Sequence, residues 1–277
     1  MERAPIAVFY ALEAESGALE DRLTEKEYLH TPGFKLISGK LKNVPFLVVR
    51  TGAGVKNARN AVENVCRIHQ PRLVISAGFA GALDYSLPKY ALFFPSEFIS
   101  ESSSSESNFS VDTERLTLYT KLTETIFSRE LRKECHFGGR LLTVGKIIAE
   151  TQEKKRLGAS YQARAVEMET YSVAEFCEEV SIPFLAVRAI SDDVERELPK
   201  DMQKLVEQKT TVSRLGAAFQ MILQRPRSVQ DMFQLYGTSI HASTNLADAI
   251  SVLAESELFS FLAENFFPPQ KPGKLIA

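Results

Sequence analysis

Three clusters of carboxylates follow directly on apolar runs in this chain of 277 residues. The clusters are Glu13 with Glu15, Glu167 with Glu169, and Asp192 with Asp193. A protein gains little stability from charge beside a buried strand. The loops at the carboxyl ends of strands often build the ligand site, and two carboxylates in unlike environments can divide into an acid and a base. The clusters therefore predict a pocket that does acid–base chemistry.

Each cluster also has a purely structural interpretation. Glu13 and Glu15 could begin a helix, where negative charge suits the positive end of the helix dipole, and Glu167 and Glu169 could do the same. Asp192 could be an N-cap. Any one cluster is explained in this way, but three of them at strand ends favour a functional site.

An α/β fold is expected to position these residues, because short apolar runs alternate with segments of helical periodicity. The expected strands of a largely parallel sheet are Ile6 to Tyr10, Phe34 to Ser38, Pro45 to Val49, Leu73 to Ser76, Leu92 to Phe98, Leu141 to Val144 and Pro183 to Ile190. Two helix faces are expected from spacings of three and four: Ala58, Val62, Val65 and Ile68, and then Val173, Phe176, Cys177 and Val180.

Two glycine-bearing loops are expected after apolar strands. They are Thr51-Gly-Ala-Gly54 and Ala77-Gly-Phe-Ala-Gly81. Neither has the spacing of a P-loop or of a dinucleotide fingerprint. Glycine lets the backbone approach a ligand closely, so both loops are candidates for the wall of a pocket.

The segments Ala165 to Ala174 and Ile182 to Asp192 closely resemble the methylthioadenosine/S-adenosylhomocysteine nucleosidases of the nucleoside phosphorylase superfamily. The segment Ala11 to Glu15 and both glycine loops occur in the family's order and approximate spacing. The resemblance covers roughly residues 4 to 200. It implies a three-layer α/β fold in which helices flank a central mixed sheet. The continuation to Pro199 and the helical C-terminus look more like the branch associated with hopanoid biosynthesis, which removes adenine from a ribosylated lipid.

The resemblance implies an enzyme that hydrolyses the N-glycosidic bond of a 5′-modified adenosine-type nucleoside and releases the purine. Asp192 matches the acid that protonates the purine N7, and Ser191 would orient it. Glu15 would activate the attacking water, with Arg188 and Glu169 completing its network. Glu169 would also accept hydrogen bonds from the ribose hydroxyls. The other expected substrate-binding residues are Glu167, Met168, Ala77, Gly78, Phe79 and Ile148.

Phosphorolysis is the main alternative to hydrolysis. Phosphorylases of the superfamily usually place an arginine and a serine where this chain has Ser76 and Phe79. A phosphate dianion needs a fixed cation, so the missing arginine favours water. Lys56, Arg50 and Arg59 could still supply a phosphate site. A non-catalytic binding protein on the same fold is a third possibility, because function does not follow from fold.

The base pocket departs from the family. The segment Gly145 to Glu150 has aliphatic Ile148 where an aromatic residue is expected, and Lys146 where an acidic residue is common. Ile148 could pack on a base, but Ile147 and Ile148 could equally be core residues.

Composition limits the remaining possibilities. The chain has 33 Lys and Arg against 35 Asp and Glu, a net charge of −2, so nucleic acid is not an expected partner. Three scattered cysteines predict neither disulfides nor a zinc site, and a reducing cytoplasm fits them. No membrane span, metal or cofactor is expected.

We expect a catalytic domain over 1–200 and a helical extension over 201–277 packed on it, and the resemblance implies a homodimer.

Overall fold

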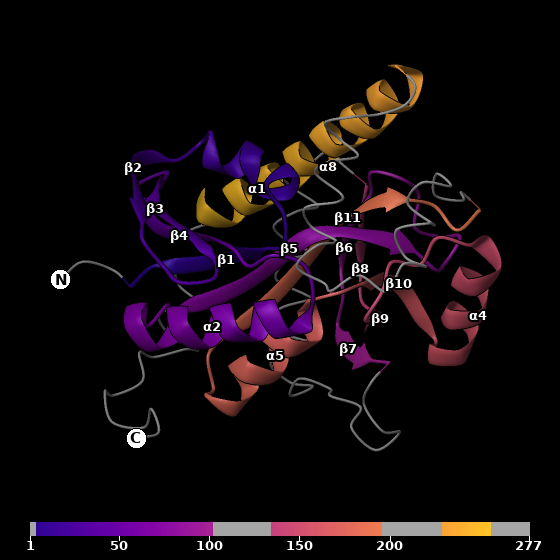
Figure 1. The fold of residues 1–277 in the computed structure, drawn as a ribbon, viewed down its shortest axis with the longest axis horizontal. Coiled ribbons are helices and arrows are strands. Elements are labelled where there is room, and N and C mark those ends of the chain that lie inside the picture. The colour runs from indigo at the N-terminus through magenta and orange to yellow at the C-terminus, as the bar shows by residue number, and fades with distance from the viewer. Residues whose placement is uncertain (1–3, 102–133, 196–228, 256–277) are drawn as a thin grey trace.

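The computed structural model describes residues 4–101, 134–195 and 229–255, with side chains from residue 239 onward in the last segment. These parts form a mixed sheet of eleven strands with helices on both faces (Figure 1). The strands are β1 (Ile6–Tyr10), β2 (Thr24–Leu29), β3 (Lys35–Leu41), β4 (Val44–Arg50), β5 (Leu73–Ala82), β6 (Leu92–Phe94), β7 (Glu97–Ser100), β8 (Cys135–Phe137), β9 (Arg140–Thr143), β10 (Ala163–Glu167) and β11 (Phe184–Asp192).

The main path through the sheet is β2-β3-β4-β1-β5-β10-β9-β7, and β11, β6 and β8 branch from β5. Strand β1 runs parallel to β4 and β5, and β11 runs parallel to β5, so their carboxyl ends lie at one edge. Strand β10 pairs antiparallel with the far part of β5, with Val166 opposite Gly81. The chain that leaves β10 therefore returns toward the middle of β5.

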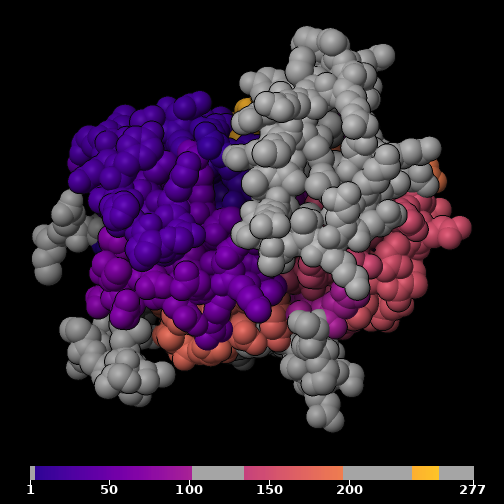
Figure 2. Space-filling view, viewed as in Figure 1, coloured from indigo at the N-terminus to yellow at the C-terminus, as the bar shows by residue number. Residues whose placement is uncertain are grey.

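Helices cover both faces of the sheet. The described helices are α1 (Glu13–Glu20), α2 (Val55–His69), α4 (Thr151–Tyr161), α5 (Thr170–Glu179) and α8 (Val229–Glu255). Helices α1 and α8 pack together on one face, whereas α2 and α5 pack together on the other (Figure 1). On the surface seen in Figure 2, the N-terminal part of the chain, in indigo and violet, lies beside the part after residue 134, in pink and orange. The result is the three-layer arrangement that the family resemblance implies.

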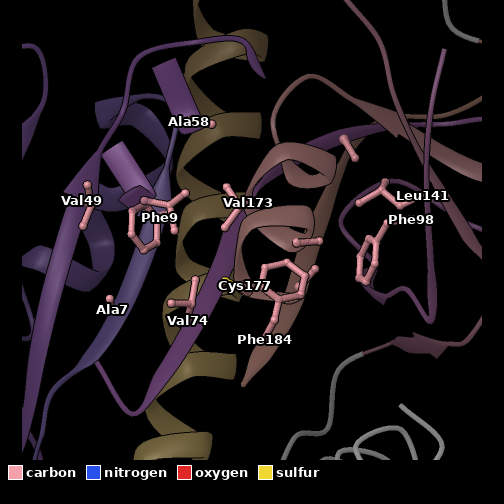
Figure 3. Packing of buried hydrophobic residues seen from close by; sticks show 14 of the residues in the cluster. Ala7, Phe9, Val49, Ala58, Val74, Phe98, Leu141, Val173, Cys177 and Phe184 are labelled. Atoms are coloured by element: carbon pink, nitrogen blue, oxygen red, sulfur yellow. The ribbon is translucent and has the colours of Figure 1, made fainter. Parts of the chain in front are cut away.

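Alternating side chains of the central strands supply the two main core layers. In β1, Ala7 and Phe9 face α2 and α5, and the intervening Ile6, Val8 and Tyr10 face α1 and α8. Figure 3 shows Phe9 near Val74, Val173 and Cys177 in the first layer. Period-two alternation with both faces buried explains the nearly continuous apolar runs of these strands.

The predicted strands are confirmed in position, with three differences. Strand β5 continues to Ala82, so the predicted loop Ala77 to Gly81 is the second half of a strand. The run Leu92 to Phe98 is split into β6 and β7. Strands β2, β8 and β10 were not predicted from the sequence. Strand β2 is mostly exposed and polar, β8 has three residues, and the apolar residues of β10 are interrupted by Arg164 and end at Glu167.

One predicted core residue of a helix is wrong. Ile68 is 64% exposed, and Cys66 takes its place beside Ala58, Val62 and Val65 on the buried face of α2. The α5 face is confirmed for Val173, Phe176 and Cys177, which are buried.

Helix α8 lies against α1, β11 and β5. Leu246, Ile250 and Leu253 are buried there. The rest of the expected helical extension, 201–228 and 256–277, lies outside the described residues. None of the helices in the described ranges is long and apolar enough to cross a membrane.

Candidate active site

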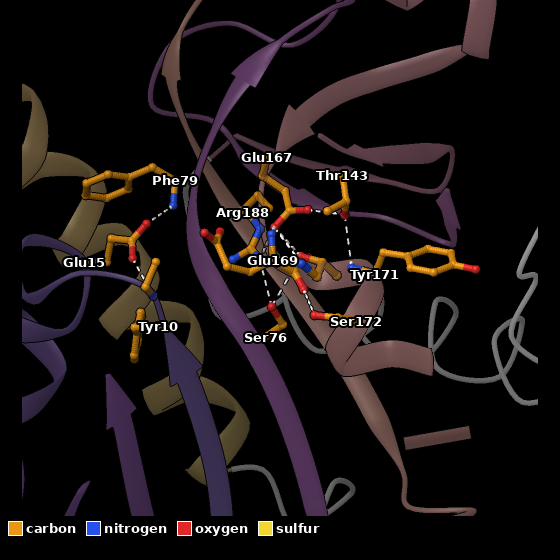
Figure 4. Close-up of polar contacts among 12 residues, drawn as sticks. Tyr10, Glu15, Ser76, Phe79, Thr143, Glu167, Glu169, Tyr171, Ser172 and Arg188 are labelled. Atoms are coloured by element: carbon orange, nitrogen blue, oxygen red, sulfur yellow. Dashed lines mark hydrogen bonds and ion pairs between the residues drawn. The ribbon is translucent and has the colours of Figure 1, made fainter. Parts of the chain in front are cut away.

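Four charged side chains gather around the middle of β5: Glu15, Glu167, Glu169 and Arg188 (Figure 4). Gly78 lies opposite Arg188 in the register of β5 and β11. A Cβ atom added to Gly78 would lie 2.8 Å from Arg188 Nη1 and 2.8 Å from Glu15 Oε1. The two charged groups therefore occupy the space that a side chain on β5 would fill, and glycine is required there because of this close approach.

Glu15 is buried and held by three backbone N–H groups. Its Oε2 accepts hydrogen bonds from Ala11 at 2.9 Å and Leu12 at 2.8 Å, and its Oε1 accepts one from Phe79 at 2.9 Å. Burial raises the pKa of Glu15, and the hydrogen bonds and Arg188 oppose that shift. The bonds to residues 11 and 12 are also helix capping, so Glu15 caps α1 and at the same time presents its carboxylate to β5.

Glu167 is the most completely bonded carboxylate of the site. Its Oε2 accepts hydrogen bonds from the N–H groups of Glu169 and Thr170 at 2.9 and 2.8 Å, and from the Thr170 hydroxyl at 2.7 Å. The Thr143 hydroxyl donates to its Oε1. Glu167 thus satisfies N–H groups at the start of α5, which fits the capping interpretation.

Arg188 lies buried between Glu167 and β5. Its Nη2 forms an ion pair with Glu167 at 2.9 Å and donates to the Ser76 hydroxyl at 2.8 Å and to Thr170. Its Nε is buried with no hydrogen-bond partner among the residues that the structure describes. The guanidinium is fixed by one carboxylate and two hydroxyls, and it still has an unused donor.

Glu169 is the N-cap residue of α5 and reaches across to the glycine loop after β4. Its Oε1 accepts a hydrogen bond from Gly54 N–H at 2.6 Å. Gly54 has a φ of 96°, a backbone conformation that favours glycine. Burial, followed by the charges of Glu167 and Glu15, raises the pKa of Glu169 to about 8.

A cavity of about 10 Å³ lies beside these groups. Its lining includes Thr51, Ser76, Glu169 and Arg188, together with apolar side chains such as Val173. That volume is close to what one water molecule needs, and the lining offers several polar partners.

Asp192 is the last residue of β11 and lies beside the far part of β5. It faces Gly81 in the register, and a Cβ atom at Gly81 would lie 3.1 Å from its Oδ2. Ser191 Oγ donates to Asp192 Oδ1 at 2.6 Å and lies 3.2 Å from the carbonyl oxygen of Ala80. The expected contact between Ser191 and Asp192 is therefore present.

Sequence reasoning missed Lys154, which forms an ion pair with Asp192 Oδ2 from helix α4. Its side chain is completely buried. Lys154 and Leu157, the two buried residues of α4, are three positions apart. That spacing places both on one helix face, and it is the signal that could have identified Lys154.

Sequence reasoning also missed the hydroxyls that fix Arg188 and Glu167. Thr143 and Thr170 are buried at the end of β9 and at the start of α5. A single hydroxyl at the end of a strand or helix forms no recognisable sequence pattern. The contact of Thr143 with Glu167 follows from the register of β9 and β10, which pairs these two residues.

The remaining predicted substrate-binding residues lie at the edges of this site. Phe79 is half-buried and packs on the core layer of α1 and α8, and Ala77 is buried in that layer. Ile148 is buried in a third cluster that Met168 contacts. Ile148 therefore has the surroundings of a core residue, and Lys146 is exposed.

Two of the three cations considered for a phosphate site are already paired. Arg50 forms ion pairs with Glu13 and Glu20, and Arg59 does so with Glu63, Glu175 and Glu179. Lys56 is exposed on α2.

Among the described parts of the chain, no group of three or more His, Cys, Asp and Glu residues could hold a metal ion.

Known proteins with similar sequences include nucleosidases. The nucleosidase of Staphylococcus haemolyticus named for 5′-methylthioadenosine and S-adenosylhomocysteine is 25% identical over 201 residues, which cover 68% of this chain and 86% of that protein. The protein of the same name from Staphylococcus aureus is 24% identical over 220 residues, with 75% and 94% covered.

Solved structures share the fold. A nucleosidase of the same name from Neisseria meningitidis, in complex with methylthio-immucillin-A, superposes with a TM-score of 0.67 at 16% identity over 90% of this chain and 99% of that one. Futalosine hydrolase of Helicobacter pylori gives a TM-score of 0.69 at 15% identity, with 91% and 98% covered. The family model of the phosphorylase superfamily matches residues 5–224, and the chain belongs to that superfamily.

Proposed function

We propose that this protein hydrolyses the N-glycosidic bond of a 5′-modified adenosine-type nucleoside and releases the purine. The observation that carries the proposal is the arrangement of two carboxylates along β5, Glu15 against Gly78 and Asp192 against Gly81. Three residues of a strand span about 10 Å, which leaves room for a sugar and a base between the two carboxylates. Asp192 would serve the base and Glu15 the sugar.

The sugar end is suited to activating water. Glycosidic cleavage passes through an oxocarbenium-like sugar. A water in the cavity beside Glu169 and Arg188 would attack the anomeric carbon and lose a proton to a carboxylate, with Glu15 as the base. The carboxylate charge would also stabilise the cationic sugar. As the new C–O bond forms, the C–N bond breaks and its electron pair leaves with the purine.

The base end supplies the proton that the leaving purine needs. Asp192 would protonate N7, and Ser191 holds the carboxylate in place. Glu169 would bind the ribose hydroxyls, with Met168 beside the ribose and with Phe79, Ala77 and Gly78 forming the wall along β5. We assign Glu167 to holding Arg188 and α5, since its oxygens already accept bonds from both.

The names of the relatives support an adenosine derivative with an altered 5′ group. The curated relatives are named for 5′-methylthioadenosine and S-adenosylhomocysteine, and a structural neighbour is named a futalosine hydrolase. Half-buried Phe79 makes an apolar 5′ substituent the first choice for testing.

Two observations favour water over phosphate as the nucleophile. Ser76 stands where phosphorylases of the superfamily usually place an arginine. Arg50 and Arg59 are bonded to carboxylates and are not available as the fixed cation that phosphate requires.

The decisive experiment incubates the purified full-length chain with adenosine, 5′-methylthioadenosine, S-adenosylhomocysteine and a 5′-alkyl adenosine, each with and without phosphate. Chromatography follows free adenine and the sugar product. We expect adenine and a free sugar without phosphate. If a sugar 1-phosphate forms, and only when phosphate is present, the proposed hydrolysis is wrong. If no substrate releases adenine, the proposal that this protein is a nucleosidase is wrong.

Asp192→Asn and Asp193→Asn form a matched pair for the same assay. Only the Asp192 carboxylate is paired with both Ser191 and Lys154. We expect Asp192→Asn to lose at least about a hundredfold in rate and Asp193→Asn to stay within a fewfold. Equal losses in both variants would count against the assignment of Asp192.

We also propose a cytoplasmic homodimer, which the family resemblance supports. Sedimentation velocity would test the dimer, with a single monomer boundary at micromolar protein as the contrary result. Fractionation of the source cells would test the location.

A further inference from the structure

Lys154 is a buried lysine that the proposed mechanism does not yet use. Its side chain has no exposed surface, and its Nζ forms the ion pair with Asp192 Oδ2 and donates to the carbonyl oxygen of Asp193 at 2.9 Å. Removing an ammonium group from water is costly unless it gains close partners. A lysine kept in such a place has either a structural or a functional reason.

The partners of Asp192 divide its two oxygens. Oδ1 accepts from Ser191 on its own strand, whereas Oδ2 accepts from Lys154 on helix α4. Helix α4 packs against β10. It begins at Thr151, directly after the predicted base-pocket segment Gly145 to Glu150. Lys154 therefore connects the helix that follows the predicted base pocket to the carboxylate that would protonate the base.

The transferable proton of this ion pair lies in the hydrogen bond that Lys154 Nζ donates to Asp192 Oδ2. A purine that leaves as an anion is a far stronger base than a carboxylate. The proton can thus move toward the purine through Asp192 as the glycosidic bond breaks.

We propose that Lys154 is a positioning residue that orients Asp192 and supplies the proton that Asp192 delivers to the purine. This inference rests on the proposed nucleosidase function. As the C–N bond breaks and its electron pair moves to the purine, a proton passes from Lys154 Nζ to Asp192 and from Asp192 to the purine nitrogen, so an N–H bond of Lys154 is replaced by an N–H bond on the base. After the base has left, the neutral amine regains a proton from solvent, and Glu15 releases to solvent the proton that it took from the attacking water.

The test compares leaving groups that do and do not need a proton. The wild type, Lys154→Met and Lys155→Met are assayed on 5′-methylthioadenosine and on 4-nitrophenyl riboside, whose phenolate leaves without protonation. Lys155 is the exposed neighbour on the same helix and serves as the matched control. We expect Lys154→Met to lose at least about a hundredfold in kcat on the nucleoside and to stay within about threefold on the nitrophenyl riboside. Lys155→Met should match the wild type on both substrates.

Equal losses of Lys154→Met on both substrates would show a purely structural role and overturn the inference, as would no loss on either. Failure of the proposed function is a separate result, because the wild type would then release no adenine from any nucleoside.

A double variant covers the case in which Lys154→Met does not fold, since that substitution leaves Asp192 buried without its cation. Asp192→Asn/Lys154→Met has no charge at the pair and is compared with Asp192→Asn alone. If Lys154 acts through Asp192, the two variants have the same nucleoside rate within about threefold. A further tenfold loss in the double variant would show that Lys154 acts independently of Asp192 and would overturn the inference.

Discussion

The Glu15 carboxylate and the Phe79 backbone N–H are joined by a hydrogen bond of 2.9 Å across 64 positions of sequence. This bond fixes the start of α1 to the middle of β5, next to the glycine that leaves room for Arg188. The position of the proposed base is therefore set by a strand of the central sheet as well as by its own helix.

Gly78→Ala should disturb both charged groups at once. The new Cβ would lie 2.8 Å from Arg188 Nη1 and from Glu15 Oε1, so at least one of these buried groups must move. We expect a loss of about 1–3 kcal/mol in the free energy of unfolding, as for other overpacked sites, together with at least a tenfold loss of kcat. Urea unfolding and steady-state kinetics measure the two effects.

Gly17→Ala is the control for that substitution. Gly17 lies within α1, and its added Cβ would meet no atom within 4 Å. Alanine at this position should leave activity unchanged and add about 0.5–1 kcal/mol of stability. Similar behaviour of the two variants would contradict the close approach at Gly78.

Glu15→Gln should separate chemistry from binding. The amide keeps the shape of the side chain but cannot take a proton from water, and its NH₂ group must face one of the three N–H donors that now bond to Glu15. We expect kcat to fall by about 10²–10⁴ with a smaller change in KM.

Glu13→Gln tests whether that effect is specific to the site. The Glu13 side chain is 56% exposed and pairs with Arg50. A change of less than about twofold in kcat is expected, and a loss comparable to that of Glu15→Gln would show that α1 as a whole, not one carboxylate, is sensitive.

The sequence predicted best those features that depend on continuous burial of a strand or on carboxylates placed at a strand end. Continuous apolar runs predicted β1, β4 and β11, because these strands are buried on both faces. The carboxylates that follow β1 and end β11, Glu15 and Asp192, pointed to the site. The alternative interpretation of the carboxylate clusters as helix caps is also partly correct, since Glu15 and Glu167 bond to N–H groups at helix starts. Capping and a place in the site are not exclusive.

Features that depend on register and long-range pairing were not accessible in this way. Strand β5 extends to Ala82 because β10 and β11 pair with its far half. The residues of β5 alone do not indicate that pairing. The ion pair of Lys154 with Asp192 joins residues 38 positions apart on different elements. Such contacts follow from topology, which a single sequence specifies only indirectly.

Ser243→Ala should weaken the hold of α8 on α1. The Ser243 hydroxyl is buried, donates to the Glu15 carbonyl oxygen at 3.1 Å and accepts from Ala18 N–H at 3.3 Å. Loss of these two bonds should lower the free energy of unfolding by about 1–2 kcal/mol. The matched control is Thr244→Ala, which removes the neighbouring, half-buried hydroxyl and should stay within about 0.5 kcal/mol. Chemical denaturation of both variants measures their free energies of unfolding. Equal losses in the two variants would contradict the role of Ser243.

Glu169→Gln should change how stability depends on pH. Burial and the charges of Glu167 and Glu15 raise the pKa of Glu169 from 4.5 to about 8, so between these values the folded protein keeps a proton that the unfolded chain has released. The contribution of this group to stability therefore falls as pH rises from about 4.5 to about 8. The glutamine variant has no such titration, so its free energy of unfolding relative to the wild type should rise steadily across that window. Urea unfolding of both proteins at pH 5, 6, 7 and 8 measures the difference. A difference that stays flat with pH would show that Glu169 ionises in the folded protein as it does in the unfolded chain.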